Sequence, residues 1–146
     1  MIKTTLLCLI LLVTTCNSHK KMPEQSVDSI AKLHDIWALN SINGEEINRA
    51  EFGGQKRIPV LEIFIEEKRI GGNDSCNELF GTIENIDNSS INFVALGGTK
   101  MACPDMKLAY KYGKALVQTR SYKIEKLQLY LYDESGKELL NFIKVD

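Results

Sequence analysis

Apolar and polar residues alternate along most of the chain, which predicts a domain built mainly of β-strands. In residues 58–65, for example, Leu61, Ile63 and Ile65 fall on one face of a strand and Glu62 falls on the other. The same alternation occurs in several other short segments. Residues 45–55 are expected to form a short strand or a loop. The expected strands are residues 35–42, 58–65, 69–70, 79–86, 91–96, 121–125, 127–132 and 139–145.

Helical spacing occurs in one stretch, where Ala109, Tyr112, Gly113, Leu116 and Val117 form one apolar stripe. We expect this stripe to be buried against the sheet, with Gly113 allowing close packing. Proline suits the first turn of a helix, because its missing N–H would be unpaired there anyway, so the helix is expected to begin near Pro104.

Polar turn residues connect neighbouring strands, as at residues 87–90 between two apolar segments. Such hairpins imply a mostly antiparallel sheet. The predicted fold class is α+β, with a strongly curved sheet or partly open barrel of about eight strands. The one helix is expected to pack over that sheet.

The N-terminal segment has the composition of an export signal, with Lys3 before an uncharged, mostly apolar stretch from Leu6 to Val13. This stretch is shorter than the ~20 residues that a membrane-spanning helix needs. We therefore interpret residues 1–15 as a signal peptide of the lipoprotein type, in which Cys16 becomes the lipidated first residue. The alternative is ordinary cleavage with no lipid, which gives a secreted or soluble periplasmic protein.

The remaining chain divides into a tether and a domain. Residues 16–32 are polar and are interpreted as a flexible tether, and residues 33–146 have the size of one domain. The formal net charge is −1, so no strong field favours nucleic acid or anionic lipid as a partner. We expect a monomer that the N-terminal lipid attaches to a membrane, on the periplasmic side of the outer membrane.

Cys76 and Cys103 are the two cysteines of the domain. An exported chain enters an oxidising compartment, where disulfides persist. A redox pair would favour closer spacing and basic neighbours, and structural zinc needs four ligands where the domain offers these thiols and His34. A structural disulfide is thus favoured over both alternatives.

Catalytic motifs are not recognised in this sequence. His34 has no nucleophile marked by a motif, and the paired acids at residues 45–46, 66–67 and 133–134 fall in expected turns. We predict no catalytic residues, no metal site and no cofactor.

Aromatic residues point to two kinds of surface. Most of them are expected in the core, namely Trp37, Phe64, Phe80, Phe93, Tyr112 and Phe142. Tyr130 and Tyr132 instead alternate with leucines of their own strand and are candidates for a partner-binding surface. A curved sheet can also enclose an apolar cavity, which would make the protein a carrier or sensor of an apolar ligand.

Four stretches of residues 33–146, taken together and in this order, resemble the META domain, the family of the HslJ heat-shock lipoprotein. The stretch from Thr99 to Pro104 is the most specific of them. The resemblance implies an envelope-associated domain, often a lipoprotein, linked in some members to stress or drug tolerance, and it implies no established reaction. We therefore expect a non-enzymatic envelope lipoprotein with an interaction or stress-tolerance role. The four stretches are Trp37–Leu39 with Asn43–Gly44, Gly72–Gly81, Thr99–Pro104, and Leu127–Leu131 with Gly136 and Phe142.

Overall fold

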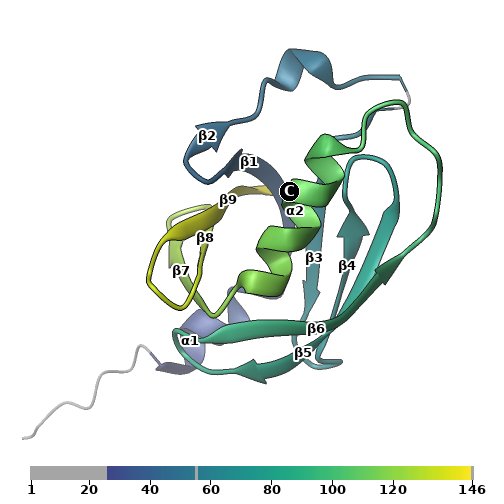
Figure 1. The fold of residues 1–146 in the computed structure, drawn as a ribbon. Helices are drawn as coiled ribbons and strands as arrows, with labels where there is room; N and C mark the ends of the chain where they lie inside the picture. Colours follow the sequence, from purple (N-terminus) through teal and green to yellow (C-terminus); the bar gives the residue numbers. More distant parts are fainter. Residues whose placement is uncertain (1–25, 55, 146) are drawn as a thin grey trace, which may run out of the picture.

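A curled antiparallel sheet around one long helix makes up the domain. The computed structural model describes residues 26–54 and 56–145, and within them a nine-stranded sheet wraps around α2 (Figure 1). This is the predicted α+β class with a strongly curved sheet. The elements are α1 (Ser26–Ala31), β1 (Ile36–Ile42), β2 (Glu45–Glu46), the 3-10 helix η1 (Arg49–Glu51), β3 (Val60–Phe64), β4 (Arg69–Asn73), β5 (Glu78–Ile86), β6 (Ile91–Gly98), α2 (Lys107–Gln118), β7 (Ser121–Glu125), β8 (Gln128–Tyr132) and β9 (Glu138–Val145).

The strand order places the first strand beside the last. It runs β6-β5-β4-β3-β1-β9-β8-β7, with β2 paired to β1, and every pairing in it is antiparallel. The edge strands β6 and β7 meet through the bridge between Ser90 and Ser121. Tyr122 N–H also donates to the carbonyl of Ser89, at 2.7 Å. The sheet is therefore a half-barrel that closes near the start of both edge strands.

The core fills the concave side of this half-barrel. Trp37 exposes 1% of its surface, and Leu129 and Phe142 expose 0%. The indole N–H of Trp37 donates to the carbonyl of Leu33 at 3.0 Å, so its one polar atom is paired. Tyr112 of α2 packs edge-on against Phe142, with the ring centroids 6.2 Å apart. The helix and the central strands thus share one core.

Helix α2 differs from its prediction at its start and on one face. It begins at Lys107, because the side chain of Asp105 accepts the N–H of Lys107 at 2.9 Å, so Pro104 lies before the helix. The buried residues are Ala109, Tyr112, Ala115 and Leu116, whereas Val117 is 52% exposed. A Cβ at Gly113 would meet no atom within 4 Å, so Gly113 permits no close packing on the sheet.

Two glycine-rich segments that look like loops in the sequence are strand. β4 continues through Gly71 and Gly72 to Asn73, and β6 continues through Gly97 to Gly98. Phe80 also departs from its prediction as a core residue, since it lies on the outer face and is 57% exposed. Its ring covers the place where a Cβ of Gly97 would stand, with the nearest ring atom 2.6 Å away.

The predictions for the N-terminal segment fall partly outside the described residues. The predicted signal peptide, Cys16 and the first part of the tether lie outside them. Residues 26–31, which we interpreted as tether, form α1, and Leu33 just after them is fully buried. None of the described helices is long and apolar enough to cross a membrane.

Candidate functional site

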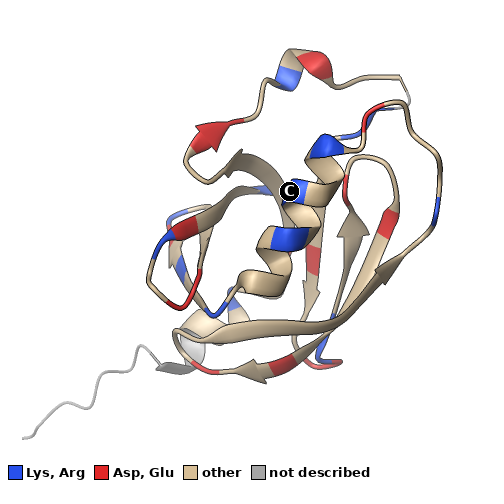
Figure 2. Ribbon diagram, in the orientation of Figure 1, with Lys and Arg blue, Asp and Glu red and all other residues tan. Residues whose placement is uncertain are grey.

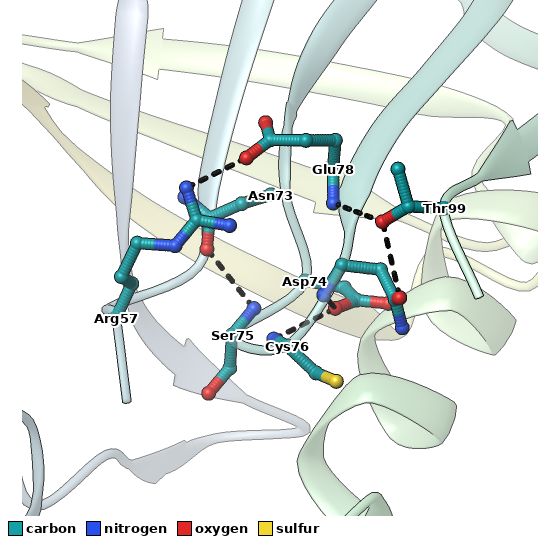
Figure 3. Close-up of polar contacts among 8 residues, drawn as sticks. Arg57, Asn73, Asp74, Ser75, Cys76, Glu78 and Thr99 are labelled. Atoms are coloured by element: carbon teal, nitrogen blue, oxygen red, sulfur yellow. Dashed lines mark hydrogen bonds and ion pairs between the residues drawn. The ribbon is translucent and has the colours of Figure 1, made fainter. Parts of the chain in front are cut away.

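The loop between β4 and β5 is shaped by its own side chains. Asn73 Oδ1 accepts the N–H of Ser75 at 3.0 Å, and Asp74 Oδ1 accepts the N–H groups of Cys76 at 2.9 Å and Asn77 at 2.5 Å (Figure 3). Such local bonds hold the chain in a tight turn. They explain why this stretch is rich in asparagine and aspartate.

Asn77 connects this loop to the segment that follows β6. Its side-chain oxygen accepts the N–H of Met101 at 2.7 Å and the hydroxyl of Thr99 at 3.1 Å. The Thr99 oxygen in turn accepts the N–H of Glu78 at 3.1 Å (Figure 3). Asn77 is 6% exposed, so these bonds are sheltered from water.

The disulfide that we predicted joins the same two segments. Cys76 and Cys103 are bonded, with their Cα atoms 6.1 Å apart and a separation of 27 positions in the sequence. The second cysteine lies just before α2. The covalent bond therefore ties the β4–β5 loop to the residues that lead into the helix. We call residues 73–78 and 99–103 the cysteine corner.

Glycines allow the backbones to approach closely beside the corner. Gly72 has φ +127°, and a Cβ there would lie 1.9 Å from the carbonyl oxygen of Val60. A Cβ at Gly98 would lie 2.3 Å from the carbonyl oxygen of Glu78. Neither position tolerates a side chain without movement of a neighbouring strand.

A shallow hollow of about 380 Å³ opens beside the cysteine corner. Its lining combines Asp74 and Asn77 with apolar groups of Met101, Ala109 and Tyr110. Met101 is 60% exposed and Tyr110 is 72% exposed. The cysteine corner and the adjoining first half of α2 thus present one large apolar side chain each to the solvent.

The phenol of Tyr112 lies beneath this region. It is fully buried, and its hydroxyl has no hydrogen-bond partner among the described residues. Burial raises the pKa of Tyr112 well above its ordinary value, and the negative charge of Asp74 raises this pKa further. Tyr112 is therefore a neutral phenol at physiological pH, and its raised pKa makes it a weaker acid than an ordinary tyrosine.

Tyr130 and Tyr132, the surface we predicted from the sequence, lie together on one face of β8 and are partly exposed. The hydroxyl of Tyr130 donates a hydrogen bond to the side chain of Gln128. Burial raises the pKa of Tyr132, and the negative charge of Glu138 raises it further. Leu127, which is 60% exposed, and Tyr130 line a second open hollow of about 380 Å³. Both faces are accessible, and the face at the corner carries the more exposed tyrosine, because Tyr110 is 72% exposed whereas Tyr130 and Tyr132 are partly buried.

The remaining candidates are far from any catalytic arrangement. His34 accepts a long hydrogen bond of 3.4 Å from Ile65 N–H and packs edge-on against Phe64. The hydroxyl of Ser135 and then the N–H of Lys137 lower the pKa of Asp133, the opposite of what a general acid needs. Within the described part of the chain, no three metal-binding side chains cluster.

Met101, Tyr110 and Val117 were not singled out as surface residues from the sequence. The spacing of Tyr110 and Val117 gives a clue, because residues seven apart lie on one face of a helix. That face lies opposite Tyr112 and Leu116, which are both 0% exposed. The spacing alone does not predict exposure, because it does not show which face of the helix is buried.

A half-barrel of antiparallel strands, one inner helix and a disulfide-tied corner together define a small α+β domain class. The sequence profile of the META domain matches residues 30–146, so the chain belongs to the META domain family. No curated protein matches the sequence.

Solved structures share the fold. A protein from Burkholderia xenovorans, solved by NMR, is 21% identical, with a TM-score of 0.57 over 89% of this chain and 96% of that one. Another NMR structure is 22% identical, with a TM-score of 0.56 over 76% of this chain and 89% of that one. A DUF4847 family protein from Bacteroides vulgatus is 14% identical, with a TM-score of 0.53 over 78% of this chain and 96% of that one. At these identities the likeness concerns the fold alone.

Proposed function

We propose that this META domain is a non-enzymatic envelope protein that binds another envelope protein through the outer face of α2. We define this face as Tyr110 and Val117 of α2 together with Met101 and Met106, which precede the helix. The observation that carries the proposal is the exposure of three of them, at 60% for Met101, 72% for Tyr110 and 52% for Val117. Large apolar side chains gathered on a rigid element are typical of a protein interface.

The filled core supports binding at the surface rather than inside the sheet. A carrier of an apolar ligand would need space beside Trp37 and Leu129, on the concave side of the half-barrel. Those two side chains expose 1% and 0% of their surface, so no water-sized space adjoins them. We therefore place the carrier hypothesis second.

The cysteine corner supports a location outside the cytoplasm. A disulfide between Cys76 and Cys103 persists in an oxidising compartment. The apolar stretch before Cys16 supports export with a lipid on that cysteine. We propose attachment to the outer membrane on its periplasmic side, with a secreted or soluble periplasmic form as the alternative, and a role in stress tolerance.

The test is crosslinking in intact cells, followed by identification of the proteins bound to the purified chain. The proposal predicts a specific protein adduct that the double variant Met101→Ser, Tyr110→Ser loses. The matched control is Tyr130→Ser, Tyr132→Ser, which changes the other exposed face and should keep the adduct. Lipid that co-purifies in place of any specific protein would overturn the proposal.

A further inference from the structure

Positive charge is concentrated on α2. The helix contains Lys107, Lys111 and Lys114 and no acidic residue, so Figure 2 shows only blue and tan along it. The three lysines lie three and four positions apart, which places like charges on one face of the helix, where they repel. Lys107 also lies in the first turn, where the positive end of the helix dipole disfavours a cation. This repulsion leaves the surface ready to accept a negative charge.

The lysines meet a further cation across a hollow. A space of about 380 Å³ lies between α2 and the turns before β2 and β9, with Lys111 and Lys114 on one side and Lys137 on the other. Asn43 and Gln118 also line it. We call this space the lysine hollow.

Carboxylates neutralise the lysine hollow only in part. Elsewhere in the described residues basic side chains form ion pairs, such as Arg57 with Glu78 at 2.8 Å and Lys144 with Asp35 at 2.7 Å. No such ion pair involves Lys111, Lys114 or Lys137 in the described part of the chain.

Asp133 is the one acid in the lining of the hollow. Its Oδ1 atom is occupied within its own turn, where it accepts the hydroxyl of Ser135 at 2.6 Å and the N–H of Lys137 at 3.0 Å. The Asp133 carboxylate stays charged and also interacts with the Lys137 ammonium, so the hollow holds three cations and one carboxylate.

We propose that the lysine hollow binds a phosphate group. Three ammonium groups and two amides offer more donors than the two oxygens of a carboxylate can satisfy, whereas a phosphate presents several acceptor oxygens in different directions. Lysine binds phosphate as a mobile point charge, so the side chains can close around the group. This inference is independent of the apolar outer face, because the two surfaces use different side chains of α2.

Two sources could supply the phosphate, a free anion or the headgroup of an anionic phospholipid. For the free anion, inorganic phosphate is titrated into the purified full chain at constant ionic strength while backbone amide NMR shifts are followed. We expect saturable shifts at Asn43, Lys114, Gln118 and Lys137. Chloride at the same ionic strength should produce none of them.

The double variant Lys111→Gln, Lys114→Gln tests the assignment. Hydrogen bonds to charged groups contribute enough that we expect binding at least about tenfold weaker. The charge-matched control is Lys68→Gln with Lys100→Gln, which removes two exposed lysines outside the hollow and should leave the affinity unchanged. Circular dichroism of each variant confirms that it is folded.

For the lipid source, the chain is sedimented with phosphatidylglycerol vesicles and with phosphatidylcholine vesicles. Binding to phosphatidylglycerol that Lys111→Gln, Lys114→Gln loses, with no response to inorganic phosphate, supports the site and assigns it to a lipid headgroup. The proposal is overturned if neither probe binds, or if the double variant and its control bind equally well.

Discussion

Loss of the Cys76–Cys103 disulfide should destabilise the domain by a predictable amount. The two cysteines are 27 positions apart, so the bond closes a loop of about 28 residues. In the chain-entropy model this lowers the entropy of the unfolded chain by about 12 cal/mol/K, which is about 3.6 kcal/mol at 25 °C. With an unfolding entropy of about 2.1 cal/mol/K per residue over the family-matched residues 30–146, the melting temperature should fall by about 15 °C.

The assay is urea unfolding and thermal melting of the wild type and of the variant Cys76→Ala, Cys103→Ala, each with and without a reductant. Reduction of the wild type should lower its stability to that of the variant. The variant itself should not respond to the reductant, which controls for other thiols. A loss of less than about 1 kcal/mol would refute the reasoning, because the hydrogen bonds of Asn77 and Asp74 would then hold the corner without the disulfide.

Three other predictions use single substitutions. Gly72→Ala should lower the free energy of unfolding by about 3 kcal/mol or more, because its Cβ would lie 1.9 Å from a backbone oxygen. In Gly113→Ala the new Cβ meets no atom within 4 Å, so this variant should be more stable in thermal melts, by up to about 1 kcal/mol. Tyr112→Phe removes a buried hydroxyl that has no hydrogen-bond partner among the described residues, and it should leave the free energy of unfolding unchanged or higher. A clear loss of stability would reveal a partner for this hydroxyl. The backbone N–H of Ser89 lowers the pKa of Asp87 below 3.8, so this carboxylate stabilises the fold above that pH. The stability advantage of the wild type over Asp87→Ala should shrink as the pH falls from 5 to 2, and a constant difference would contradict the assignment.

The sequence predicts the strands well wherever side chains alternate. β5 and β6 follow the expected hairpin, and the turn between them is where Asp87 and Ser90 indicate it. The ends of β4 and β6 could not be predicted, because Gly72 and Gly98 have no side chain whose pattern reports a strand. Their strand conformation depends on contacts with Val60 and Glu78, which are distant in sequence.

The candidate site also has features that the sequence predicts and features that it does not. The disulfide could be predicted, because the domain contains two cysteines, which leave one pairing. The exposure of Tyr110 and Val117 could not, because an apolar residue on a helix indicates burial until the orientation of the helix is known. That orientation is fixed by Tyr112, Ala115 and Leu116, which face the core. The lysine hollow depends on the turn with Lys137 lying across from α2, an arrangement that no local pattern encodes.

The proposed role of the outer face of α2 can be tested directly by photocrosslinking from that face in living cells. A photoreactive amino acid replaces Tyr110, which is 72% exposed, and in a matched strain it replaces Leu127, which is 60% exposed on a different face. The account predicts one discrete protein adduct from position 110 and none from position 127. Equal adducts from both positions, or none from position 110 in a folded and correctly located protein, would contradict it.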